Sequence, residues 1–112
     1  MPRLVVMESP YKAETEEELD RNLRYARACM RDCFIKGDYP FASHLLYTQE
    51  GVLDDNNLDE RRLGIEAGLE WVKIAEATIV YTDYGITDGM KRGIDRAEKE
   101  GRIVEYRNLK KV

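Results

Sequence analysis

The alternation of short apolar runs with amphipathic stretches is the feature that most constrains the fold of this chain. Residues 4–7 and 78–82 form continuous apolar runs, which are typical of strands covered on both faces. Residues 40–44 and 103–106 give two further strand signals, and helical periodicity occupies the three intervals between the strands. We predict one α/β domain over residues 1–112, a three-layer Rossmann or flavodoxin-like fold. Its four-stranded parallel sheet should have the order 2-1-3-4, with three main helices.

Local signals set the bounds of the expected helices. Thr15 and Glu18 match a capping box, so the first helix should begin there and end before Gly37. The second helix should run over residues 58–76, and the third should begin within residues 85–90 and run to about residue 100. The first helix should bury one apolar stripe: Leu19, Leu23, Ala26, Met30, Cys33 and Phe34. The second should bury another: Leu63, Ala67, Trp71 and Ile74.

Gly64 and Gly68 lie one turn apart beside the second stripe. Small residues at this spacing allow another backbone to approach, either that of the protein's own sheet or that of a partner's helix. The adjacent large side chain of Trp71 favours packing that extends into a homodimer.

Composition excludes several classes of function. The net charge of −4 and the pI of about 5.1 argue against nucleic-acid binding by bulk charge. No apolar run approaches the ~20 residues of a membrane span, and the start of the chain leads into a strand, so we expect a cytoplasmic protein. Cys29 and Cys33 have no further His or Cys nearby, which indicates buried thiols and no metal site. No motif indicates a cofactor.

The carboxyl ends of the first and third strands mark the predicted binding edge, because the winding of the sheet reverses there. The third helix begins just after the third strand, so its free N–H groups would attract phosphate or another anionic oxygen. Gly85 and Gly89 would allow a ligand to approach the backbone closely. The candidate ligand-binding residues on this edge are Ser9, Pro10, Tyr11, His44, Tyr47, Asp54, Tyr84, Thr87, Asp88, Gly89 and Met90.

Several of these residues have two interpretations. The tyrosines Tyr11, Tyr47 and Tyr84 would converge to stack on a nucleobase, or would simply cover apolar surface. His44, the single histidine, is either structural or acts as a hydrogen-bond donor or an acid/base group near neutral pH. Loop carboxylates at residues 54 and 55 would hold ribose hydroxyls or cap the next helix, and the cap is favoured for Asp55.

Short motifs follow one another in order along residues 4–106: Ser9-Pro10-Tyr11, Asn22, Pro40, Ser43-His44-Leu45, Leu53-Asp54-Asp55, Glu60-Arg61, Leu63-Gly64, Thr87-Asp88-Gly89-Met90, Ile94 and Ala97. In order and spacing they resemble the nucleoside 2-deoxyribosyltransferase-like superfamily, and more specifically a bacterial and phage branch of small Rossmann-like proteins. The resemblance implies a fold that binds nucleosides or nucleotides, usually as a homo-oligomer.

The resemblance breaks at one position. In catalytic members, a Glu on the third helix attacks the anomeric carbon, and the matching position here is Gly93. Asp95 lies about 200° further around the helix, so it should face away. Glu66 and Glu70 belong to another helix and should be exposed.

We therefore predict a nucleotide-binding protein that lacks the usual catalytic Glu. In its most concrete form it is a phage sponge that sequesters an immune signal of the cyclic dinucleotide or cyclic ADP-ribose type, acting as a homodimer or higher homo-oligomer in the host cytoplasm. The alternative is a nucleoside or nucleotide N-glycosidase or deoxyribosyltransferase with an altered active site, for which His44, Asp83 and Asp88 are the catalytic candidates. A third possibility is an interaction module with a vestigial pocket.

Overall fold

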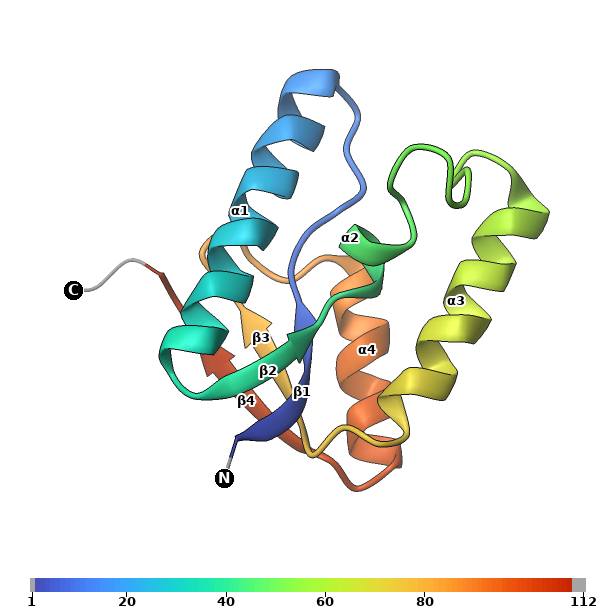
Figure 1. Cartoon of the computed structure of the whole chain (residues 1–112). Coiled ribbons are helices and arrows are strands. Elements are labelled where there is room, and N and C mark those ends of the chain that lie inside the picture. Colours follow the sequence, from blue (N-terminus) through green and yellow to red (C-terminus); the bar gives the residue numbers. More distant parts are fainter. Residues whose placement is uncertain (1, 110–112) are drawn as a thin grey trace.

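A four-stranded parallel sheet forms the centre of the protein (Figure 1). The computed structural model describes residues 2–109. The strands are β1 (Arg3–Glu8), β2 (Asp38–Phe41), β3 (Ala77–Tyr81) and β4 (Ile103–Arg107). Their order in the sheet is β2-β1-β3-β4, and every neighbouring pair is parallel. The predicted fold class and strand order are confirmed.

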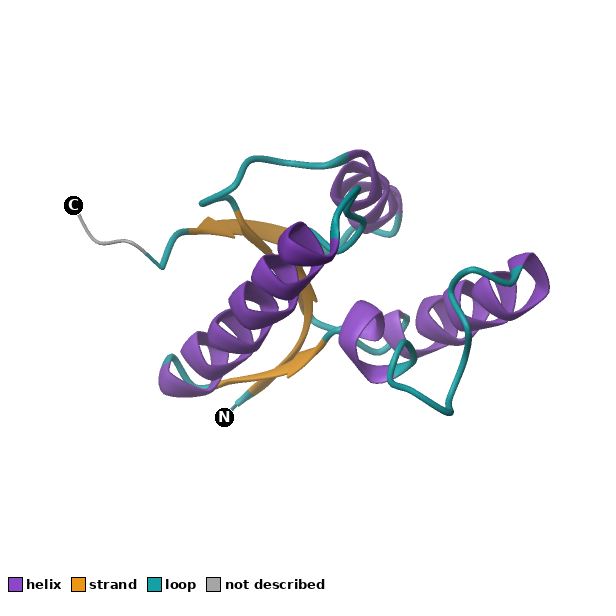
Figure 2. Cartoon of the chain, turned by 90° about the horizontal axis from the view of Figure 1, so that it is seen from above, coloured by secondary structure: helices purple, strands orange, loops and turns teal. Residues whose placement is uncertain are grey.

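Helices cover both faces of the sheet, with α1 on one side and α3 and α4 on the other (Figure 2). The helices are α1 (Glu16–Ile35), α2 (Ser43–Leu46), α3 (Leu58–Val72) and α4 (Asp88–Lys99). The sequence analysis missed the short α2 and placed strand signal over its first residues. Within residues 2–109, no helix is long and apolar enough to cross a membrane.

Hydrogen bonds reproduce the predicted start of α1, whereas α3 ends at Val72, four residues before the predicted end. The Thr15 hydroxyl accepts the N–H of Glu18 at 3.1 Å, and the Glu18 carboxylate reaches back to the N–H of Glu14 at 3.0 Å. Gly37 follows α1 with a φ of +86°, a conformation that glycine adopts without strain. The Thr87 hydroxyl accepts the N–H of Met90 at 3.2 Å and begins α4 in the same way.

The two faces of the sheet are packed unequally. On the α1 side, a continuous cluster joins the helix to the strands: Val5, Met7, Tyr25, Ala26, Cys29, Cys33, Ala42, Ala77, Ile79 and Tyr81. Both cysteines are free, buried thiols, as predicted. On the opposite side, the buried cluster is confined to Val80, Met90 and Ile94, with Val104 packed against it. The α1 side therefore carries most of the core.

The predicted buried stripe of α3 is wrong, as is the burial of Phe34 at the end of α1. Leu63 and Trp71 are each 55% exposed, and Ile74, which lies beyond the end of α3, is 59% exposed. The side of α3 that faces inward is formed by its glycines: a Cβ on Gly64 would lie 3.2 Å from Leu53, and one on Gly68 would lie 3.3 Å from Ser43. The glycines thus bring α3 against α2 and the loop before it, not against the sheet. A homodimer stays a prediction.

An ion-pair network ties the two edge strands to β1. Asp38 on β2 receives hydrogen bonds from Arg3 at 3.0 and 3.1 Å and from Arg107 of β4 at 2.8 Å. Glu105 accepts from the same two arginines. Asp38 is 4% exposed, and its pKa is lowered first by its hydrogen bond to Arg3. The network fixes strands that are far apart in the sequence.

We expect Asp38→Asn to destabilise the fold by about 2–4 kcal/mol at pH 7, since it leaves Arg3 and Arg107 without their shared buried charge. Because folding lowers the pKa of Asp38, its contribution is present at neutral pH and is lost as the pH falls through the acid range. Urea unfolding at pH 7 measures the loss. The control is Asp20→Asn, which removes an exposed ion pair with Arg24. Equal losses in the two variants would contradict the prediction.

Candidate functional site

A cavity of about 1030 Å³ opens between α3 and α4, above β1 and β3. Val6, Glu8 and Thr78 line its floor from the strands. α3 contributes Gly64, Gly68 and neighbouring residues, and the first turn of α4 contributes the opposite wall. The cavity is the space that the partly covered face of the sheet leaves open.

The cavity gathers most of the predicted site residues: Ser9, Tyr11, His44, Tyr47, Thr87, Asp88, Gly89 and Met90. Asp54 lines a smaller neighbouring pocket of about 440 Å³, which shares Tyr11 with the main cavity. Pro10 is buried and lines neither of these two pockets. The edge predicted from the strand order therefore coincides with a cavity of about 1030 Å³.

Two predicted residues lie elsewhere. The Tyr84 ring packs edge-on against Tyr25 with centroids 4.7 Å apart, and the Arg21 guanidinium lies 4.3 Å above it. Asp83 accepts the Tyr25 hydroxyl at 2.6 Å and the N–H of Leu109 at 3.0 Å. Both residues turn toward the α1 side. The predicted convergence of three tyrosines is wrong for Tyr84, and Asp83 joins α1 to the segment after β4 outside the cavity lining.

Ser9 and His44 form a hydrogen-bonded pair at the end of β1. The Ser9 hydroxyl lies 2.8 Å from His44 Nε2, and the Tyr11 ring stands edge-on to the imidazole with centroids 6.2 Å apart. Burial lowers the pKa of His44 to about 4, so the ring is neutral at pH 7. Of the roles predicted for His44, hydrogen bonding fits this environment, whereas titration near neutral pH does not.

Polar side chains of the loop before α3 accept hydrogen bonds from backbone N–H groups close to them in the sequence. Asn57 caps the helix by accepting the N–H groups of Asp59 at 3.0 Å and Glu60 at 3.1 Å. The cap predicted for Asp55 is therefore wrong, and Asp55 lines the cavity. Asp54 accepts the N–H of Asn56 at 2.9 Å, which closes a local turn.

Glu8, the last residue of β1, is the functional candidate that the sequence analysis missed. A Cβ built on Gly93 would lie 2.6 Å from the carboxyl carbon of Glu8 and 3.1 Å from one of its oxygens, well inside van der Waals contact. The Glu8 carboxylate thus occupies the space of a side chain at residue 93. Gly93 was expected to leave the site without a carboxylate. Its lack of a side chain instead makes room for the carboxylate of Glu8 on β1. The sequence held one signal for this, a glycine inside the third helix with no turn to explain it.

Glu8 has an unusual electrostatic environment. None of the hydrogen bonds or ion pairs among residues 2–109 involves its carboxylate, which retains some exposure to the cavity. Burial raises the pKa of Glu8 to about 8, against a smaller opposing effect of the Arg102 charge. A raised carboxyl pKa in a cavity is typical of a functional site.

Basic side chains surround the same space. Arg102 is held on the floor by hydrogen bonds to Thr78 at 3.1 Å and to the carbonyl of Val72 at 2.9 Å. The other basic residues that line the cavity are Lys12, Arg61, Arg92 and Arg96. Acidic residues line the same cavity: Glu8, Glu14, Glu18, Asp55, Glu60 and Asp88. The lining is therefore mixed in charge, and its arginines offer guanidinium donors to an anionic group without making the whole cavity positive. No group of residues within 2–109 could hold a metal ion.

The comparison with protein families identifies the chain. Residues 3–107 match the model of DUF7768, a domain of unknown function. The chain belongs to this family. No curated protein matches it.

Among solved structures, the fold is similar to that of a 2-deoxyribosyltransferase from the psychrotolerant bacterium Bacillus psychrosaccharolyticus. The TM-score is 0.66 at 18% sequence identity, and the match covers 97% of this chain and 76% of that one. The deoxyribosyltransferase-like fold expected from the sequence motifs is therefore present in the DUF7768 chain.

We expect Glu8→Gln to stabilise the protein at pH 8 by on the order of 2 kcal/mol and to have little effect near pH 4.5. The folded-state pKa of about 8 lies above the ordinary value of 4.5, so wild-type stability falls as the pH rises between them. The neutral amide has no such dependence. Thermal unfolding from pH 4.5 to 8.5 measures the difference, with the exposed Glu50→Gln as control. Parallel pH profiles for wild type and Glu8→Gln would refute the prediction.

Proposed function

We propose that the large cavity binds a nucleotide-type small molecule. The observation that carries this proposal is that the amino end of α4, the Tyr11 ring and several arginines all line one space. Phosphate favours helix N-termini and guanidinium groups, and a nucleobase favours an aromatic ring. A ligand that combines a phosphate with a base matches this set better than a purely apolar or purely anionic one.

Each part of such a ligand has a matching wall. The phosphate would lie against the first turn of α4, with Arg92 of the next turn also lining the cavity. The base would pack against Tyr11 or Tyr47 on the loop side. The sugar would then lie between these ends, close to Ser9, His44 and Glu8.

The fold likeness supports the same ligand class. The similar 2-deoxyribosyltransferase is described as a biocatalyst for the synthesis of nucleosides. Ligands of such open α/β sheets bind beyond the carboxyl ends of the strands, where this cavity lies. The proposal is therefore consistent with both the local chemistry and the architecture.

A second candidate is sequestration of a larger nucleotide-derived signal, such as a cyclic dinucleotide or a cyclic ADP-ribose. The cavity volume of about 1030 Å³ favours it, because that is at the upper end of the roughly 300–1,000 Å³ of ordinary ligand pockets. A phage sponge acting in the host cytoplasm is the form of this candidate that the sequence motifs favour. Recovery of the ligand unchanged from denatured complex would support it.

We expect isothermal titration calorimetry to detect binding of at least one nucleoside 5′-monophosphate, cyclic dinucleotide or cyclic ADP-ribose isomer. Gly89→Trp should weaken that binding by about 100-fold or more, since an indole in the first turn of α4 would fill the phosphate end of the cavity. The fold should persist, because Gly89 is exposed and a Cβ there meets nothing closer than 3.9 Å.

The matched control is Glu98→Trp, an exposed position on α4 outside the cavity lining. It should bind like the wild type, and circular dichroism should show all three proteins folded. If no compound binds the wild type, or Gly89→Trp binds as tightly as Glu98→Trp, the proposed site is wrong.

A further inference from the structure

We propose that Glu8 is a catalytic carboxylate that cleaves the N-glycosidic bond of the bound ligand, a role that rests on the nucleotide site proposed above. Cleavage or transfer at a sugar's anomeric carbon passes through an oxocarbenium-like state, which an adjacent carboxylate stabilises or attacks. The enzyme would therefore act on a nucleoside or nucleoside 5′-monophosphate instead of only holding it.

The Glu8 carboxyl group occupies the space that a side chain at residue 93 would need. Any side chain at residue 93 would collide with the Glu8 carboxyl group, whose carbon lies 2.6 Å from the position of a Cβ. Glycine in the middle of a helix costs about 1 kcal/mol relative to alanine. The glycine in α4 leaves room for the Glu8 carboxylate in the position that the structure gives it.

Glu8 lacks the ion pairs that two other carboxylates of the same sheet, Asp38 and Glu105, form. Asp38 and Glu105 are each paired with Arg3 and Arg107, so their charges stabilise the fold. Glu8 has no hydrogen bond or ion pair within the described part of the chain, and it faces the cavity. Enclosing a carboxylate without a partner is unfavourable, and such groups are typical of sites where a ligand supplies the partner.

The polar and charged groups around Glu8 also fit the proposed role. The Ser9–His44 pair, which follows it in sequence and lines the same cavity, offers hydrogen bonds to sugar hydroxyls. Arg102 on the floor favours the charged form of the carboxylate. α4 begins at the Thr87 cap, so its positive end and Gly93 lie on one helix about two turns apart. A phosphate at that end would place the sugar, not the base, near Glu8.

The proposed reaction has two steps. The ionised form of Glu8, which predominates above its pKa of about 8, is the nucleophile. One of its oxygens attacks C1′ of the sugar, the C1′–N bond breaks, and its electron pair passes to the base nitrogen, which takes a proton from solvent. Water then attacks C1′ of the glycosyl ester, and the ester bond breaks with its electron pair returning to Glu8. The water releases one proton, so the products are the free base and the hydroxylated sugar.

Base release from ribo- and 2′-deoxyribonucleosides and their 5′-monophosphates, followed by liquid chromatography, tests the proposal. The wild type should release base from at least one member of the class. Glu8→Gln should lower the rate by about 100-fold or more while its calorimetric Kd stays within about threefold of the wild type. Glu66→Gln, an exposed carboxylate on α3, is the control and should keep full activity.

A relocation experiment separates a catalytic role from a structural one. Glu8→Ala should be inactive, and Glu8→Ala combined with Gly93→Glu should regain at least about tenfold activity, because the second substitution returns a carboxylate to the vacated space. Restored folding alone would not restore base release.

Nucleotide binding by a wild type that releases no base from any member of the panel would overturn this inference and leave the proposed function standing. Equal rates for wild type and Glu8→Gln would overturn it as well. Absence of binding would overturn both proposals.

Discussion

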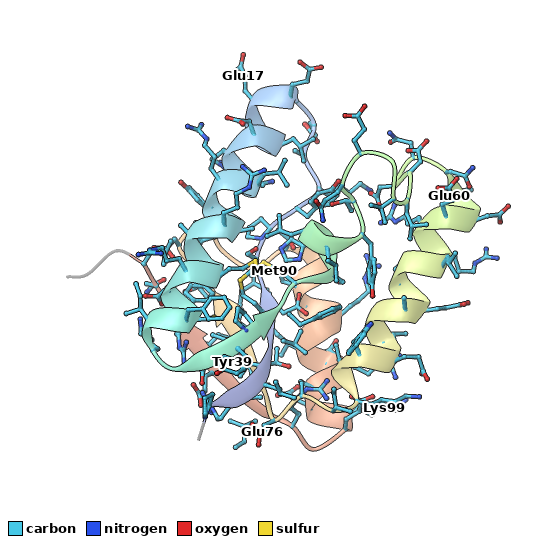
Figure 3. All side chains as sticks on the ribbon, viewed as in Figure 1. Glu17, Tyr39, Glu60, Glu76, Met90 and Lys99 are labelled. Carbon is cyan, nitrogen blue, oxygen red and sulfur yellow. The ribbon has the colours of Figure 1, made fainter. Side chains whose placement is uncertain are left out.

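The sheet is covered closely by α1 on one face and only in part by α4 on the other, and the candidate site depends on this difference. The α1 cluster contains most of the buried apolar side chains. On the opposite face, α3 contacts α2 and the preceding loop through Gly64 and Gly68, Leu63 of α3 is largely exposed, and Trp71 stacks on Phe41 of β2. The floor residues Glu8 and Thr78 are consequently open to a cavity instead of being packed beneath a helix (Figure 3 shows the side chains around it).

Sequence patterns were sufficient for the architecture because each strand and helix had a local signal. The apolar run before Ser9 and the Thr15 cap define β1 and α1 independently, and the handedness of parallel crossovers then restricts the strand order. The binding edge followed from that order. Ser9, His44 and the first turn of α4 come from three separated segments and meet around one cavity.

The sequence analysis failed where the outcome depends on contacts between distant elements. Periodicity marked Leu63 and Trp71 as apolar positions but not which side of α3 would have a surface to pack against. The Tyr84 ring packs against α1, where it contacts the Tyr25 ring and the Arg21 guanidinium. Glu8 follows the predicted strand of residues 4–7, and nothing near it in the sequence indicates its proximity to Gly93, 85 positions later in the numbering.

The relation between Glu8 and Gly93 also changes how a missing catalytic residue should be understood. A glycine at an expected nucleophile position suggests loss of activity when the helix is considered alone. The reaction proposed for Glu8 needs a carboxylate beside the sugar, and the Glu8 carboxylate of β1 lies in the space next to Gly93 of α4. An ion pair with a basic side chain would make the Glu8 charge stabilise the fold, as the pairs with Arg3 and Arg107 do for Asp38. Its unpaired state in the cavity is the arrangement expected when the carboxylate is kept for a ligand and not for the stability of the fold.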